Sequence, residues 1–134
     1  MTQLAILLVE EMTQSAQRQT RSDGLAPTIT LQRIQAYAQT HITRQLSMEE
    51  LAGAANCSEA SVYRLFREHV HTTPGRWLTR LRMERAANLL RTSTLAVSEI
   101  GERVGYADPF HFSRVFKRER GVSPRTYRDR QLIL

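Results

Sequence analysis

Apolar residues recur at helical spacing along most of this chain, and the pattern predicts an all-α fold. The segment 2–20 is the first example, because its apolar residues lie three or four positions apart and so indicate an amphipathic helix. This stripe consists of Leu4, Leu7, Leu8 and Met12. Residues 21–27 follow it with Ser, Asp, Gly and Pro, a composition typical of a linker.

A second apolar stripe begins at Ile29 and predicts the first helix of the main body. Its members are Leu31, Ile34, Ala38 and Ile42, with Tyr37 at the edge. Ser47 and Glu50 then have the spacing of a capping box, in which two side chains satisfy the free amides of a helix start. We expect that helix to end near Ala55, because Asn56 tolerates the left-handed conformation that ends a helix.

The next predicted helix covers residues 59–70 and is capped by Ser58. Its apolar side holds Val62, Leu65, Phe66 and Val70. Two helices joined by so short a turn, the second with an outward polar face, indicate a helix-turn-helix unit. Thr73 and Pro74 then predict a longer helix over residues 74–91, with threonine as the cap and proline at the first helical position, where its missing N–H is not needed.

The whole pattern returns 49 or 50 residues later. The segments Glu50-Leu51-Ala52, Arg64-Leu65-Phe66-Arg67 and Thr73-Pro74 come back as Glu99-Ile100-Gly101, Arg114-Val115-Phe116-Lys117 and Ser123-Pro124. In the second copy Gly105 takes the left-handed turn position, Asp108 caps the next helix before Pro109, and Gly121 ends it. We therefore divide the chain into an N-terminal helix and linker (1–28), a first helix-turn-helix subdomain (29–74), a linker helix (75–92) and a second helix-turn-helix subdomain (93–134).

The charge of the chain favours a polyanionic partner. Its 134 residues carry a formal net charge of +6, with a pI of about 10.4. Residues 103–134 hold eight basic and three acidic residues, so this end should supply most of the attraction to a polyanion. Lys117 is the only lysine, and arginine suits bidentate contacts to phosphate and guanine. Genomic base composition is the alternative explanation of the arginine bias.

Several other classes of protein and site are excluded. Cys57 is the only cysteine, so there is no intrachain disulfide, cysteine-rich zinc site or iron–sulfur cluster. The sequence has no Gly-rich phosphate loop and no H-E-x-x-H motif, and we predict no catalytic residue, cofactor or metal site. The apolar run 4–9 is too short to cross a bilayer and no basic residue precedes it, so we expect a cytoplasmic protein without membrane contact.

Each repeat offers one candidate recognition helix, 59–70 and 109–120. The outward residues, our candidate DNA contacts, are Glu59, Ala60, Tyr63, Arg64 and Arg67 in the first and Pro109, Phe110, Ser113, Arg114 and Lys117 in the second. Arg64 and Arg114 rank highest because they occupy matching positions, although a solvated helix face is the alternative. A linker helix of about 18 residues is ~27 Å long. The two recognition helices should then lie about one turn of B-DNA apart, ~34–36 Å, so that a monomer reads two successive major-groove segments.

Five longer motifs lie on these elements: LSMEELA from Leu46, YRLFR from Tyr63, RMERAANLL from Arg82, IGERVGYADPFHFSRVFK from Ile100 and GVSPRTYR from Gly121. Residues 46–128 thereby resemble the DNA-binding domain of the AraC/XylS family of bacterial transcription regulators. The resemblance implies a seven-helix domain of two bridged subdomains, sequence-specific promoter binding, and activation through contact with RNA polymerase. The base-contacting positions that it implies fall on Ala60, Tyr63, Arg64, Pro109, Phe110, Ser113 and Arg114.

The chain departs from the family pattern at several positions. Asn56 replaces the usual turn glycine, and His71 stands where a glycine commonly precedes Thr-Pro or Ser-Pro. Gly101 replaces the usual alanine and should loosen its helix by up to about 1 kcal/mol. Ala60 can at best touch a thymine methyl, so specificity in the first unit should depend more on Arg64, with help from Tyr63 or Glu59. On the linker helix we expect Arg82 and Glu84 to form structural ion pairs.

Two functions from different classes fit these observations. The leading hypothesis is a sequence-specific DNA-binding activator of transcription that inserts both recognition helices into a bacterial promoter. The alternative is an adaptor that keeps the fold without reading DNA, suggested by Ala60 and by the balanced charge of residues 46–102. Many full-length relatives carry an N-terminal effector and dimerisation domain. We expect the helix around Leu4–Met12 to be the tail of such a missing domain, with a small stand-alone regulator as the alternative.

Overall fold

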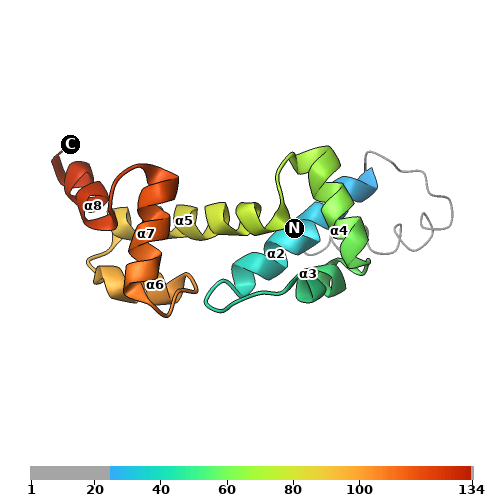
Figure 1. The fold of residues 1–134 in the computed structure, drawn as a ribbon, viewed down its shortest axis with the longest axis horizontal. Helices are drawn as coiled ribbons and strands as arrows, with labels where there is room; N and C mark the ends of the chain where they lie inside the picture. The colour runs from blue at the N-terminus through green and yellow to red at the C-terminus, as the bar shows by residue number, and fades with distance from the viewer. Residues whose placement is uncertain (1–24, 134) are drawn as a thin grey trace, which may run out of the picture.

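The computed structural model describes residues 25–133, and all regular secondary structure in this part of the chain is helical (Figure 1). Its helices are α2 (Leu25–Thr40), α3 (Met48–Ala55), α4 (Glu59–Leu65), α5 (Pro74–Thr92), α6 (Val97–Arg103), α7 (Pro109–Arg120) and α8 (Pro124–Ile133), and a π-helical segment η1 (Phe66–Val70) continues α4. The all-α expectation with seven α-helices in two linked units is confirmed. The helix expected over residues 2–20 lies outside the described residues.

The predicted helix caps are present. The Glu50 N–H donates to Ser47 Oγ at 3.1 Å and the Ser47 N–H donates to Glu50 Oε1 at 3.0 Å, which completes the capping box of α3. Asn56 ends α3 in the left-handed conformation with φ 58°. Thr73 caps α5 and Asp108 caps α7, each followed by proline in the first turn. Local sequence therefore determines where these helices begin.

The first described helix starts earlier than expected. Residues 21–27 have linker composition, yet α2 already begins at Leu25. The expectation was wrong for its last three residues because Pro27 falls in the first turn of α2. An N–H in the first turn of a helix has no intrahelical partner, so proline, which lacks an N–H, is tolerated there.

Each unit has its own hydrophobic core. The first core holds Ile34, Ala38, Leu51, Ala52, Ala55, Val62, Phe66 and Leu78. The second core holds Met83, Ala86, Ala87, Leu90, Ile100, Val104, Phe112, Val115 and Phe116. The sequence repeat is visible in the packing, because Phe66 meets Trp77 edge-on at 5.4 Å and Phe116 meets Tyr127 edge-on at 5.5 Å.

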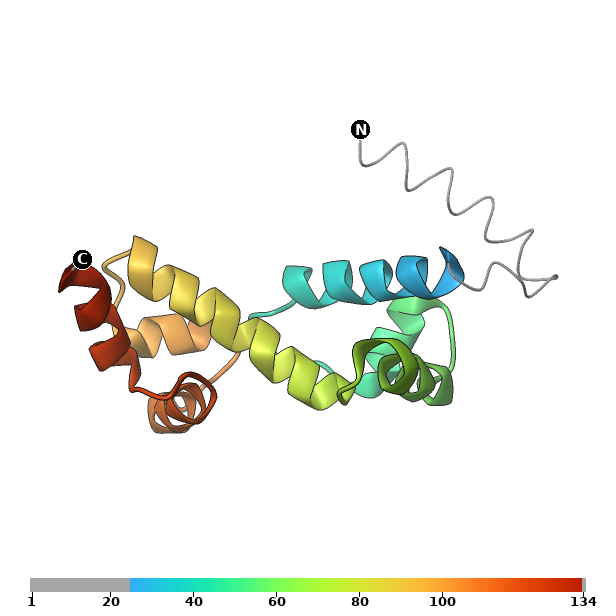
Figure 2. The ribbon, with the colours of Figure 1, turned by 90° about the horizontal axis from the view of Figure 1, so that it is seen from above.

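Helix α5 belongs to both units. Trp77, Leu78 and Leu81 in its first half pack on the first core, whereas Met83 and the apolar residues that follow it enter the second core. Figures 1 and 2 show α5 as a rod with one unit at each end. The changeover between the two cores falls at position 82 of the chain.

Gly101 has a packing role that the sequence did not indicate. It is buried in α6, and a Cβ built on it would lie 3.0 Å from Cγ of Phe112, which is closer than ordinary van der Waals contact. The Phe112 ring is fully buried and occupies the space that an alanine methyl would need. The glycine thus makes room for the second core as well as lowering helix propensity.

The second helix of the first unit is not a uniform α-helix. From Phe66 its hydrogen bonding becomes π-helical, and the His71 N–H donates to the Phe66 carbonyl at 2.7 Å. His71 then ends the segment in the left-handed conformation with φ 64°. The matching residue of the second unit is Gly121, at φ 85°. The first unit therefore carries backbone strain where the second has a glycine.

Replacing His71 with glycine is expected to stabilise the protein by about 1 kcal/mol, because glycine adopts a positive φ without a Cβ clash. Thermal denaturation followed by circular dichroism would show a higher Tm. The matched control is His69→Gly, two residues earlier in the right-handed helix, which should lower the Tm. A lower Tm for His71→Gly would show that its imidazole makes a compensating interaction.

Glu50 gives the fold a specific sensitivity to acid. The Ser47 N–H bond and the Arg44 guanidinium, at 2.7 Å, lower the pKa of Glu50 to about 2. Its folded pKa lies below the unfolded value, so its contribution to stability is present above about pH 4.5 and is lost as the pH falls toward 2. The free energies of unfolding of Glu50→Gln and of the parent, measured by urea titration, should differ most at neutral pH and converge near pH 2. A difference that does not change with pH would contradict this interpretation.

Candidate nucleic-acid interface

The two candidate recognition helices face the same side of the molecule. In Figure 1, α7 crosses in front of one end of α5 and α4 stands beyond the other end, and both run from the edge that holds α3 and α6 toward the opposite edge. In Figure 2, which is turned by 90°, α7 lies below the left half of α5 and α4 lies beyond its right end, both toward the lower edge of the view. The two candidate recognition helices therefore run in the same direction at the two ends of α5.

In the first unit the polar face of α4 is open. Val62 and Phe66 are buried and hold this helix on the first core. All five of its candidate contacts, Glu59, Ala60, Tyr63, Arg64 and Arg67, are exposed, and the Tyr63 side chain is 47% exposed. Ser58 fixes the helix start by accepting the Ser61 N–H at 3.1 Å. This arrangement agrees with the predicted outward face.

In the second unit the outward face is more apolar. Phe112, Val115 and Phe116 anchor α7 in the second core. The candidate contacts Pro109, Phe110, Arg114 and Lys117 are exposed, whereas Ser113 is partly buried. Phe110 is 73% exposed at the start of the helix, where its N–H donates to Asp108 Oδ1 at 2.9 Å. A large exposed aromatic ring beside a positive charge is suited to contact with the edge or methyl group of a base.

The key arginines are free to bind an anion. Arg44 pairs with Glu50, Arg103 with Glu99 and Arg118 with Glu119. None of these pairs includes Arg64 or Arg114, and both of those side chains are exposed. Lys117, Arg118 and Arg120 add positive charge to the last turn of α7. The second helix thus offers the stronger electrostatic attraction.

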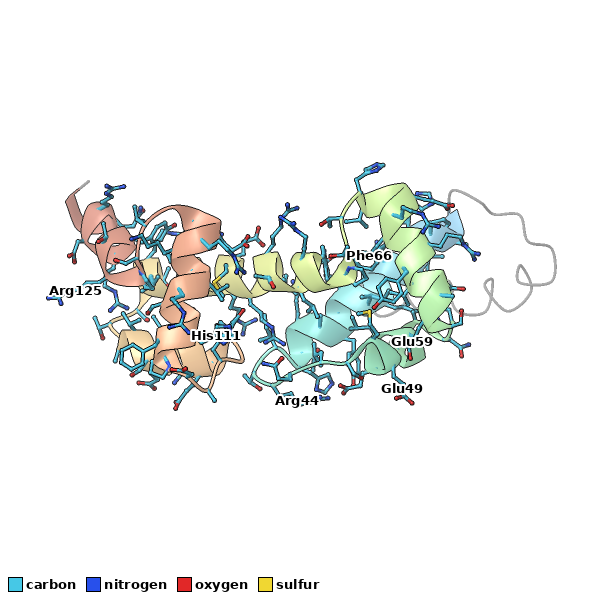
Figure 3. All side chains as sticks on the ribbon, viewed as in Figure 1. Arg44, Glu49, Glu59, Phe66, His111 and Arg125 are labelled. Atoms are coloured by element: carbon cyan, nitrogen blue, oxygen red, sulfur yellow. The ribbon has the colours of Figure 1, made fainter. Side chains whose placement is uncertain are left out.

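Other residues singled out in the sequence have structural positions. His111 is exposed, and its ring meets Tyr106 edge-on at 5.3 Å, so it covers the edge of the second core (Figure 3). Cys57 is half-buried against the first core, and burial raises the pKa of its thiol. Residues 25–133 contain no group of three side chains placed to hold a metal ion. None of the helices in this range is both long and apolar enough to cross a membrane.

The expectation of an ion pair at Arg82 was wrong. Its guanidinium is buried and donates to backbone carbonyl oxygens instead of a carboxylate. Burial lowers the pKa of Arg82 from its ordinary value. Glu84 is exposed on the same helix. The only sequence signal for this role is an arginine placed between the apolar residues Leu81 and Met83.

Comparison with known proteins agrees with this geometry. Residues 51–130 match a family model described as a helix-turn-helix domain. The HTH-type transcriptional activator RhaS of Enterobacter sp. (strain 638) is 36% identical over 99 residues, which are 74% of this chain and 36% of that protein. An AraC-type transcriptional regulator from Chromobacterium violaceum superposes with a TM-score of 0.72 and 25% identity, covering 76% of this chain and 91% of that one.

The chain belongs to the AraC-type helix-turn-helix family. It is therefore a member of a family of DNA-binding transcription regulators, not of an enzyme family. The AraC-type likeness includes a domain solved on DNA: the DNA-binding domain of AdpA, in complex with a target DNA, is 34% identical with a TM-score of 0.69, covering 75% of this chain and 90% of that one. This AraC-type chain spans about a third of the length of the curated relatives it matches.

Proposed function

We propose that this protein is a sequence-specific activator of transcription that inserts α4 and α7 into two successive major-groove segments of a bacterial promoter. The observation that carries the proposal is the placement of Arg64 and Arg114. They are exposed at matching positions on two helices that run in the same direction at the two ends of α5. A single molecule therefore presents two arginines to one side of a duplex.

The proposed contacts differ between the two helices. Arg64 and Arg114 each donate to the O6 and N7 atoms of a guanine, the pairing for which the guanidinium fork is shaped. Phe110 contacts a thymine methyl, and Ala60 does so over a smaller area. Arg67 and Lys117, three residues after each arginine, neutralise backbone phosphates. Tyr63 and Glu59 supplement the first helix, and Pro109 and Ser113 line the second.

The activator role and the partners are drawn from relatives. The name of RhaS calls that protein a transcriptional activator, and AdpA's domain is solved on target DNA. We extend both to this chain as a proposal, with double-stranded DNA as the partner of α4 and α7. RNA polymerase is the proposed partner for activation, and an effector domain joined through the N-terminal segment is the proposed source of regulation.

Selection of bound duplexes from a random pool tests the proposal. The expected result is a preferred site with two guanine-containing boxes about one helical turn apart, bound by one protein molecule per duplex. The affinity should fall steeply with salt, because phosphate contacts release counterions. Enrichment of no sequence at moderate salt would reject the proposal and favour the adaptor hypothesis. That alternative gains weight from the exposed alanine at position 60 of the first recognition helix.

A further inference from the structure

A buried arginine lies at the middle of the molecule. The Arg82 side chain extends from α5 and is only 5% exposed. Its Nη1 donates to the Val104 carbonyl at 2.7 Å and to the Ile42 carbonyl, and its Nη2 donates to the Arg44 carbonyl at 2.8 Å. One side chain thus binds three backbone oxygens from two segments that are distant from it in the sequence.

These oxygens come from both units. Ile42 and Arg44 lie in the loop between α2 and α3, which belongs to the first unit. Val104 ends α6, which belongs to the second. A second bond crosses at the same place, because Gln45 Nε2 donates to the Gly105 carbonyl at 2.9 Å. Figure 1 shows the α2–α3 loop reaching toward the turn that follows α6. Arg82 and Gln45 therefore join the units directly.

The turn after α6 is shaped around this guanidinium. Gly105 has φ 97°, which favours glycine. A Cβ at this position would overlap the Arg82 guanidinium and would lie 2.9 Å from the Ile42 carbonyl oxygen. A larger residue would displace the arginine from its acceptors. Glycine is thus favoured here both by the positive φ of the turn and by the space that the Arg82 guanidinium occupies.

Apart from α5, which packs into both cores, no closely packed pair of the described helices joins the two units. The helix pairs that pack closely either lie within one unit or include α5. The two cores do not share a residue. A charged group buried among neutral acceptors contributes little net stability, because its desolvation offsets most of its hydrogen bonds. Its bonds do require a single geometry, however, since the planar guanidinium must meet all three oxygens at once.

We propose that Arg82 is a positioning residue that fixes the relative rotation of the two helix-turn-helix units. By tying the α2–α3 loop and the end of α6 to the middle of α5, it sets the angle between α4 and α7. We call these Arg82 hydrogen bonds the clamp. The consequence for DNA rests on the proposed function: with the clamp in place, the protein binds the two guanine-containing boxes of its site at only one spacing. Without the clamp, the units rotate about α5 and tolerate other spacings.

The rotation can be measured without DNA. Spin labels at positions 67 and 117, the matching residues of the two recognition helices, are introduced in a Cys57→Ala background. Pulsed electron paramagnetic resonance then gives the distribution of distances between them. We expect a narrow distribution for the parent and for the matched control Arg85→Met, whose side chain is exposed on the same helix. Arg82→Met should broaden the distribution. An equally narrow distribution in folded Arg82→Met would overturn the proposal.

A second variant protects the test against loss of folding. Gln45 is exposed, and Gln45→Ala removes the other cross-unit bond without entering either core. We expect it to broaden the distance distribution less than Arg82→Met does. If Arg82→Met does not fold, Gly105→Ala decides, because its Cβ would displace the Arg82 guanidinium from its acceptors. A broader distance distribution in that variant supports the role of Arg82, and an unchanged one contradicts it.

Binding to spaced sites completes the test. Two extra base pairs between the boxes of the selected site rotate one box by about 70° relative to the other. The parent should lose about tenfold or more in affinity on that duplex, whereas Arg82→Met should bind the two duplexes within a factor of about three. Equal spacing preference in both proteins would reject the role in DNA reading. Absence of any sequence preference would instead reject the proposed function, and the distance distribution would still test the clamp.

Discussion

Replacing Arg114 with alanine is expected to weaken binding to the selected DNA site by about 1–3 kcal/mol, roughly 5- to 150-fold. The guanidinium is exposed on α7, is held in no ion pair among the described residues, and lies on the side of the helix opposite the buried Phe112 and Phe116. Its removal leaves the helix intact, so the lost affinity reports its contact with DNA. Fluorescence anisotropy on the selected site and on a random duplex measures the effect.

The comparison of the two duplexes decides what Arg114 contacts. If Arg114 reads a base, its removal lowers the affinity mainly for the selected site and relaxes the sequence preference at one base pair. The matched control is Arg120→Ala, in the last turn of the same helix. It should lower the affinity for both duplexes to a similar small extent. An equal loss on both duplexes for Arg114→Ala would leave it a phosphate contact and reject its role in base reading.

Replacing Phe116 with alanine is expected to lower the free energy of unfolding by about 3–5 kcal/mol. Its ring is fully buried and packs against Phe112 at 6.0 Å and Tyr127 at 5.5 Å between centroids. The substitution leaves a cavity where α5, α7 and α8 meet, and rigid neighbours close it only in part. Urea denaturation followed by circular dichroism measures the loss.

Phe110→Ala is the matched control, because it removes the same ring from the same helix at a site that is 73% exposed. Its free energy of unfolding should change by no more than about 0.5 kcal/mol. Its affinity for the selected DNA site should fall instead, since the ring is the proposed thymine contact. Similar losses of stability in the two variants would show that Phe110 packs on the protein.

Local features of this fold could be predicted from the sequence, because neighbours in the chain decide them. The Ser47–Glu50 capping box, the Thr73–Pro74 start of α5 and the left-handed Asn56 each depend on a few consecutive residues. The core faces of α4 and α7 also followed from periodicity, and the duplication doubled the signal. Nine of the ten outward candidates are exposed for the same reason and Ser113 is partly buried, and their contacts with DNA stay a prediction.

The features that could not be predicted depend on distant contacts. Arg82 was expected to pair with a carboxylate, but its partners are carbonyl oxygens 22 to 40 residues away, which carry no sequence signature. Gly101 looked like a weakness in a helix, yet its neighbour is the Phe112 ring of another helix. The π-helical turn after Phe66 likewise has no counterpart in the matching second helix, although both segments have similar side-chain patterns.

The shared direction of α4 and α7 has a consequence for promoter architecture. Dimeric regulators related by a two-fold axis require palindromic operators, which look the same from either strand. Here α4 and α7 run in the same direction at the two ends of α5, so the proposed target consists of unequal boxes in tandem (Figure 1). Such a site has a direction. Inverting it within the promoter would reverse the orientation of the bound protein relative to the proposed partner, RNA polymerase.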